Sequence, residues 1–66
     1  MSNKKDKPTV KLSGQDGNVF NLIAICSREL KRAGLNDEAK TMTEEIFASG
    51  SYDEALQIMM NYVDVE

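Results

Sequence analysis

The chain has 66 residues, a single cysteine, no histidine and a formal net charge of −3. These values exclude an intrachain disulfide and a Cys/His metal site, and they argue against a protein built chiefly to neutralise phosphates. A chain this short buries only about 60% of its unfolded surface, so its own core is marginal. We therefore expect one small domain with no cofactor, reinforced by association with another chain.

No apolar run approaches the length of a membrane span, and the N-terminal stretch MSNKKDKPTV has no apolar segment of the kind found in signal peptides. A single unpaired cysteine fits a reducing compartment. We therefore expect a soluble, cytoplasmic protein without a membrane partner.

Residues 1–8 are polar, charged and without periodicity, which is typical of a disordered basic arm. The remaining residues, 9–66, are expected to form the single domain. Basic residues gather in the first eleven positions and again near the middle of the chain, and the rest is acidic. The two basic groups are Lys4, Lys5, Lys7 and Lys11, and then Arg28, Lys31 and Arg32. We interpret them as a solvated tail and a solvated helix end.

Residues 9–13 alternate between polar and apolar, with Val10 and Leu12 on one side and Lys11 on the other. This period of two is typical of a half-buried strand. A lone strand leaves backbone donors and acceptors unpaired, so it requires a partner.

The next stretch, GQDGNVFNLIAI, allows two interpretations. Asp16-Gly17 is suited to a type I′ turn, which would fold residues 10–12 back onto VFNLIAI as a hairpin. Alternatively, Asn18 or Asp16 caps a helix. We favour the helix, because a hairpin strand would have to end inside this run without a turn signal.

Four apolar residues support a helix from Asn18, because they repeat at i, i+4, i+7 and i+11: Val19, Ile23, Cys26 and Leu30. Gly34 is expected to terminate this helix, with basic residues in its last turn. In VFNLIAIC seven of eight residues are apolar, more than one buried face needs. Phe20, Ala24 and part of Leu22 therefore cover the small sheet or meet another chain.

A second helix is predicted over 37–48, capped by Asn36. Its inward stripe is Ala39, Met42, Ile46 and Phe47. Ser51 and Glu54 have the spacing of a capping box, so a third helix starts there. Its apolar face comprises Tyr52, Ala55, Leu56, Met59, Met60 and Val63.

The chain ends in YVDVE, which alternates like a strand. Pairing with residues 10–12 would satisfy both lone strands and bring the two ends together. The expected fold is α+β, mainly α, with a short N-terminal strand, three helices and a short C-terminal strand paired with the first.

Few residues suggest catalysis, and we expect no enzymatic activity. Cys26 lacks a histidine base and lies on the apolar stripe of a helix, which indicates an inert buried thiol. Met42, Met59 and Met60 are expected to fill the core, the alternative being an adaptable partner groove. The loop between strand and helix is interpreted as a turn and helix cap, or as a partner or ligand contact. The contact residues in that second case are Gln15, Asp16, Gly17, Asn18 and Phe20.

The segments VKLSGQDGNVF, LKRAG and SGSYDEALQIMMNYVDVE resemble a family of very short bacterial and phage-encoded proteins. The resemblance covers about residues 10–66. The matching positions are Gly14, Asp16, Gly17, Asn18, Phe20, Ala33, Gly34, Gly50, Tyr52, Asp53, Leu56, Val63, Val65 and Glu66. Members often have aspartate before the tyrosine where this chain has Ser51, which still caps a helix. The resemblance implies a bacterial or mobile-element origin and a cytoplasmic location, and it implies no activity.

The order strand, helix, short turn and helix is also similar to that of the ribbon-helix-helix DNA-binding proteins. By that analogy Thr9, Lys11 and Ser13 would face the bases. The acidic chain, the Asn36-Asp37-Glu38 sequence and the third helix count against it, so we do not expect nucleic acid to be a partner. Our main hypothesis is a small non-enzymatic interaction protein that binds a protein partner or itself through the first helix and the GQDGN loop. The alternatives are DNA binding and small-ligand binding at that loop.

Overall fold

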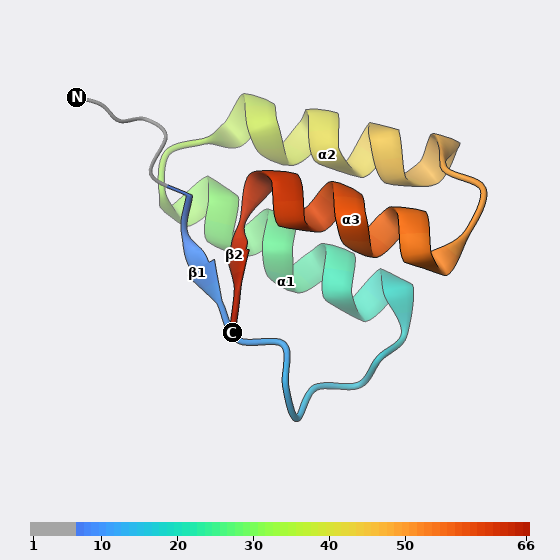
Figure 1. Ribbon diagram of the computed structural model, residues 1–66. Helices are drawn as coiled ribbons and strands as arrows, with labels where there is room; N and C mark the ends of the chain where they lie inside the picture. Colours follow the sequence, from blue (N-terminus) through green and yellow to red (C-terminus); the bar gives the residue numbers. More distant parts are fainter. Residues whose placement is uncertain (1–6) are drawn as a thin grey trace.

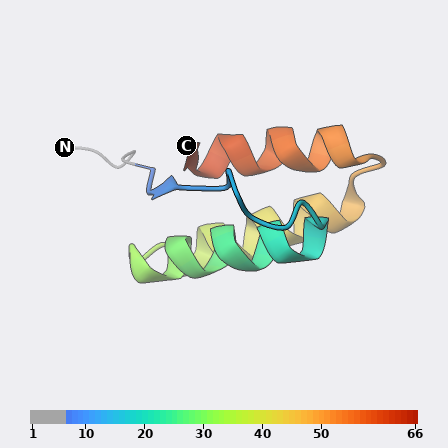
Figure 2. The ribbon, with the colours of Figure 1, turned by 90° about the horizontal axis from the view of Figure 1, so that it is seen from below.

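The computed structural model describes residues 7–66, so most of the expected arm lies outside the described residues. The fold is α+β and mainly α, as expected from the sequence (Figure 1). In chain order the elements are β1 (Thr9–Val10), α1 (Val19–Arg32), α2 (Asn36–Ala48), α3 (Tyr52–Tyr62) and β2 (Asp64–Val65). Consecutive helices are antiparallel, and α3 lies on one side of the molecule while α1 and α2 share the other (Figure 2).

The first helix begins where the capping signal predicts. The Asn18 side chain accepts a hydrogen bond from the backbone N–H of Phe20 at 2.8 Å, and Asp16 Oδ1 accepts one from the Asn18 N–H at 3.1 Å. These bonds satisfy donors at the start of α1. The alternative hairpin is wrong, because residues 19–25 are helical. The positive φ in this loop belongs to Gly14, at 83°.

The first helix ends at the predicted glycine. Gly34 has a φ of 82°, which lets its N–H bond the Lys31 carbonyl at 3.0 Å and the Leu35 N–H bond the Leu30 carbonyl at 2.8 Å. This pair of bonds is a Schellman motif, which satisfies the last carbonyls of the helix and reverses the chain.

The second helix starts one residue earlier than predicted, and the expected cap at Asn36 is wrong. Leu35 occupies the N-cap position without a side-chain cap hydrogen bond, and Asn36 is already helical. Because the Schellman motif reverses the chain at Gly34, Leu35 directly joins the two helices and packs its side chain against the core. Asp37 and Glu38 lie in the first turn, where the helix dipole favours carboxylates.

The third helix begins at Ser51, as the capping-box spacing predicts. The Ser51 hydroxyl accepts a bond from the Glu54 N–H at 3.1 Å. The Glu54 carboxylate reaches back to the Gly50 N–H at 2.7 Å, one residue before the donor used in the usual capping box.

The two ends of the domain pair as expected. β1 and β2 form a parallel two-stranded sheet with Thr9 opposite Asp64 and Val10 opposite Val65. β1 is shorter than the predicted strand over 9–13. The Leu12 carbonyl accepts a bond from the Gln15 N–H at 3.1 Å, which turns the chain away from the sheet.

The core contains the predicted apolar stripes with three exceptions. Met42, Met59, Cys26 and Leu30 are all fully buried, so these two methionines fill the core as expected. Phe47, Tyr52 and Met60 were expected to point inward, but they are 63%, 46% and 48% exposed. Neighbouring helical positions point about 100° apart, so Phe47 is directed outward when Ile46 is buried. In α3, the buried positions are taken by Ala55 and Met59.

Replacing Gly34 with alanine tests the left-handed turn. A Cβ at Gly34 meets no heavy atom within 4 Å, so the expected loss comes from backbone strain alone, about 1 kcal/mol of unfolding free energy in urea. Gly50→Ala is the matched control, because Gly50 does not have a φ in the left-handed region, and its stability should change little. Equal losses in both variants would contradict the assignment.

Candidate functional site

The GQDGN loop crosses the domain between β1 and α1 (Figure 2). Its side chains are exposed, and two of them bond to nearby backbone at the start of α1, as described above. Asn21 adds a third local bond, from its Nδ2 to the Asp16 carbonyl at 3.0 Å. The turn-and-cap role of Asp16 and Asn18 is therefore present in the structure, and Gln15 lies exposed beside them.

A tyrosine of α3 holds this loop in place. The Tyr52 hydroxyl donates to the Gly17 carbonyl at 2.6 Å, across 35 residues of sequence. A Cβ at Gly17 would meet this hydroxyl oxygen at 3.5 Å, an ordinary contact distance. From the sequence Tyr52 was expected on the apolar face of α3, and its hydrogen bond to the loop was not predicted. Only the residue type could have indicated this bond, because tyrosine has a hydroxyl that can form a hydrogen bond and phenylalanine does not.

Between the loop and α3 lies an open groove of about 390 Å³, which we call the loop groove. Its lining is mostly apolar, with Ser13 and Glu66 as polar exceptions. It is lined by Leu12, Ser13, Gly17, Leu22, Tyr52, Leu56, Met59, Met60, Val65 and Glu66. Three of the five large hydrophobic residues that the domain exposes, Tyr52, Met60 and Val65, lie here. The loop groove thus gathers much of the exposed apolar area of the domain.

The other two exposed large hydrophobic residues form an aromatic pair. Phe20 of α1 and Phe47 of α2 are 65% and 63% exposed, with ring centroids 6.1 Å apart and an interplanar angle of 40°. Together with exposed Ala24, we call them the aromatic surface. The expectation that Phe20 covers the sheet is wrong, because β1 lies near the opposite end of α1 (Figure 1). Leu22 instead belongs to the core.

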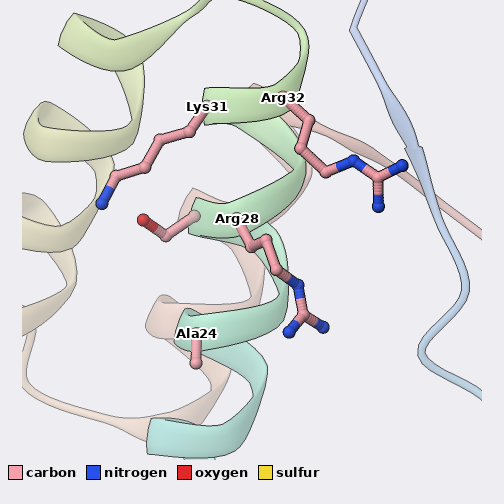
Figure 3. A pocket seen from close by; sticks show the side chains of 5 residues that line it. Ala24, Arg28, Lys31 and Arg32 are labelled. Atoms are coloured by element: carbon pink, nitrogen blue, oxygen red, sulfur yellow. The ribbon is translucent and has the colours of Figure 1, made fainter.

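The second half of α1 carries the basic residues. Arg28, Lys31 and Arg32 surround an open hollow of about 500 Å³ floored by Ala24 and Ser27 (Figure 3). Lys31 points to one side of the helix, and the two arginines point to the other. Arg32 Nη1 lies 3.6 Å from Glu29 Oε2 in a solvent-exposed pair. The basic cluster is therefore spread over the outer face of α1.

The residues proposed for DNA contact are also exposed. Thr9 lies in β1, and Lys11 and Ser13 follow it toward the loop. One edge of β1 is occupied by β2 of the same chain, whereas ribbon-helix-helix proteins pair this strand with a second chain.

Cys26 is fully buried on the core side of α1. Burial raises the pKa of its thiol to about 11, so the thiol stays protonated at neutral pH. The pKa of Tyr62 is also raised. The larger cause is desolvation, and the second is the hydrogen bond that the Tyr62 hydroxyl donates to the Glu45 carboxylate at 3.1 Å. Within residues 7–66, no group of three or more cysteine or carboxylate side chains is arranged to hold a metal ion.

In the part of the chain that the structure describes, no helix has the length and apolar character required to cross a membrane. Comparisons with protein-family models, curated proteins and solved structures gave no significant match to this chain. The two exposed apolar regions and the residues that surround them are therefore the features of the domain that bear on function.

Replacing Tyr52 with phenylalanine tests the attachment of the loop to α3. Losing this hydrogen bond should lower stability by about 1 kcal/mol and accelerate amide hydrogen exchange at Gly17 and Asn18. Tyr62→Phe is the control, because the Tyr62 hydroxyl bonds Glu45 and lies away from the loop. Loop exchange that is unchanged in Tyr52→Phe would contradict this role.

Proposed function

We propose that this chain is a small, non-enzymatic interaction protein of bacterial or mobile-element origin that acts in the cytoplasm. Its contact with a protein partner is the aromatic surface, flanked by the GQDGN loop. The observation that carries this proposal is the Phe20–Phe47 pair, two large aromatic rings from different helices that contact each other while both stay more than 60% exposed.

Exposed aromatic rings are unfavourable, because each Å² of apolar surface left in water forgoes about 25 cal/mol of the free energy gained by burial. Scattered single apolar residues are normal on a surface, but a contiguous pair with apolar neighbours is typical of an interaction site. Interfaces are enriched in phenylalanine at their centre and are surrounded by polar groups. Gln15, Asp16 and Asn18 supply such groups at the N-terminal end of α1, directly before Phe20.

The origin is supported by the sequence resemblance alone. The absence of catalysis is supported by the protonated, buried state of Cys26, the lone thiol of the chain. The acidic net charge and the pairing of β1 with β2 count against the DNA-binding alternative through Thr9, Lys11 and Ser13.

Replacing Phe47 with serine tests the proposal. The immobilised wild-type chain should retain a partner protein from a bacterial lysate. The amount retained by Phe47→Ser should be at least about tenfold lower. Because Phe47 is exposed, unfolding free energy should fall by less than about 1 kcal/mol, far below the 3–5 kcal/mol of a buried phenylalanine.

Met60→Ser is the matched control, since Met60 is also exposed but lines the loop groove. It should leave retention unchanged. Equal retention by wild type and Phe47→Ser would contradict a role for the aromatic surface.

The loop groove favours a second candidate function, the binding of a small apolar ligand beside the GQDGN loop. Its volume of about 390 Å³ falls within the usual range for ligand sites. A titration with 1-hexanol followed by NMR should shift the methyl signals of Leu12, Leu56 and Met60, and Met60→Ser should weaken the shifts. Shifts confined to Phe20 and Phe47 would contradict this candidate.

A further inference from the structure

We propose that the partner of the aromatic surface is an acidic amphipathic helix of another protein. Its apolar side chains cover the Phe20 and Phe47 rings. Its carboxylates meet the basic cluster on the second half of α1, which comprises Arg28, Lys31 and Arg32. This inference rests on the proposed function and specifies the chemistry of the partner.

The aromatic surface and the basic cluster share one face of α1. Successive residues of an α-helix are about 100° apart, so four residues that run from the rings to the cations project within an arc of about 80°. They are Phe20, Ala24, Arg28 and Lys31, and all of them are exposed. With a rise of about 1.5 Å per residue, Arg28 and Lys31 lie about 12 and 17 Å from Phe20 along the helix axis. One partner helix of about eleven or more residues therefore reaches from the rings to the cations.

The middle of this face allows a partner helix to approach closely. Ala24 and Ser27 form the floor of the open hollow of about 500 Å³, and the basic cluster surrounds it (Figure 3). Small side chains at the contact permit short distances between packed helices. Lys31 projects to one side of α1, and Arg28 and Arg32 project to the other. A helix laid over the hollow therefore meets cations on both of its flanks.

Positive charge is concentrated on this face although the chain as a whole is acidic. The net charge is −3, and residues 41–66 contain no lysine or arginine. Among the described residues, the ion pair formed is Arg32 with Glu29 at 3.6 Å, so Arg28 and Lys31 have no ionic partner there. A local positive surface attracts carboxylates and favours one alignment of the partner. Charge complementarity thus selects an acidic partner.

The arrangement favours separate carboxylates over the phosphates of a nucleic acid. Two glutamates lie beside the cations, because Glu29 pairs with Arg32 and Glu44 lines a hollow together with Lys31. A DNA duplex carries one phosphate charge for about every 1.7 Å of its axis, so it would bring phosphates next to both glutamates. A protein helix can instead place single carboxylates at Arg28 and Lys31, with neutral groups beside the glutamates.

The experiment uses capped alanine-rich peptides of about 20 residues, which are long enough to be helical. The acidic peptide carries two leucines and, about two to three turns further along the same face, two glutamates. In its neutral twin, glutamines replace these glutamates. NMR titration at low salt should show that the wild type binds the acidic peptide at least about tenfold more tightly than the neutral twin. Added salt should reduce this difference, because it screens exposed charges.

Paired variants locate the contact on the protein. Arg28→Gln/Lys31→Gln should lower the affinity for the acidic peptide at least about tenfold and leave that for the neutral twin unchanged. Gln57→Glu/Asn61→Glu is the matched control, because it makes the same change in net charge at exposed positions of α3. It should keep the preference for the acidic peptide. Circular dichroism reports whether each variant is folded.

An acidic peptide that does not bind at millimolar concentration would overturn the inference. Equal affinities of the wild type for the two peptides would also overturn it, as would a preference that Arg28→Gln/Lys31→Gln retains. Tighter binding of the wild type to a DNA duplex than to the acidic peptide at the same salt concentration would overturn it in favour of nucleic acid.

Phe47→Ser separates this inference from the proposed function. It should weaken the binding of both peptides alike, because both place leucines on the rings. If it does so while the peptide charges make no difference, the acidic partner is ruled out and the proposed function stands. A charge preference with affinities that Phe47→Ser leaves unchanged would instead contradict the proposed function.

Discussion

The packing of three helices around a very small core governs the rest of this structure. Leu30, Met42 and Met59, one from each helix, are fully buried and belong to one core cluster. A core of this size has room for few large side chains, and methionine fills irregular space well because it is unbranched and flexible. Large aromatic rings are left outside. The exposure of Phe20 and Phe47 is thus a consequence of how α1 and α2 use their inward positions.

The parallel pairing of β1 with β2 completes this small fold. It anchors the N-terminal segment beside the end of α3, through bonds such as Asp64 N–H to the Pro8 carbonyl at 2.9 Å. The chain must then cross the domain to reach the start of α1, and the GQDGN loop makes that crossing. Its attachment by Tyr52 leaves the loop groove between the loop and α3. The groove therefore follows from the topology.

Local chemistry explains which features were predictable from the sequence. Caps at Asn18 and Ser51 and the stop at Gly34 depend on neighbouring residues, so their positions were correct. Asn36 failed as a cap because the preceding Schellman motif turns the chain at Gly34, and Leu35 is the only residue between that glycine and the first residue of α2.

The candidate site was less predictable. Phe20 was identified from the surplus of apolar residues in the first turns of α1, whereas Phe47 was assigned to the core. Residues near the boundary of an apolar stripe can point either way, and only the rotation of α2 against α1 decides. The contact between the two rings, and the bond from Tyr52 to Gly17, join residues 27 and 35 positions apart. No local pattern encodes such pairs.

Small size also links stability to association. A ligand or partner that binds only the folded state stabilises it by mass action, so covering the aromatic surface would add to the marginal stability of a 66-residue chain. The usual internal reinforcements are limited here, because the single cysteine is buried and unpaired and histidine is absent. A protein partner bound to the aromatic surface would supply such reinforcement. Such a partner would cover the Phe20 and Phe47 rings, which the core leaves exposed. Because the small core leaves Phe20 and Phe47 exposed, association that covers these rings would stabilise the folded chain.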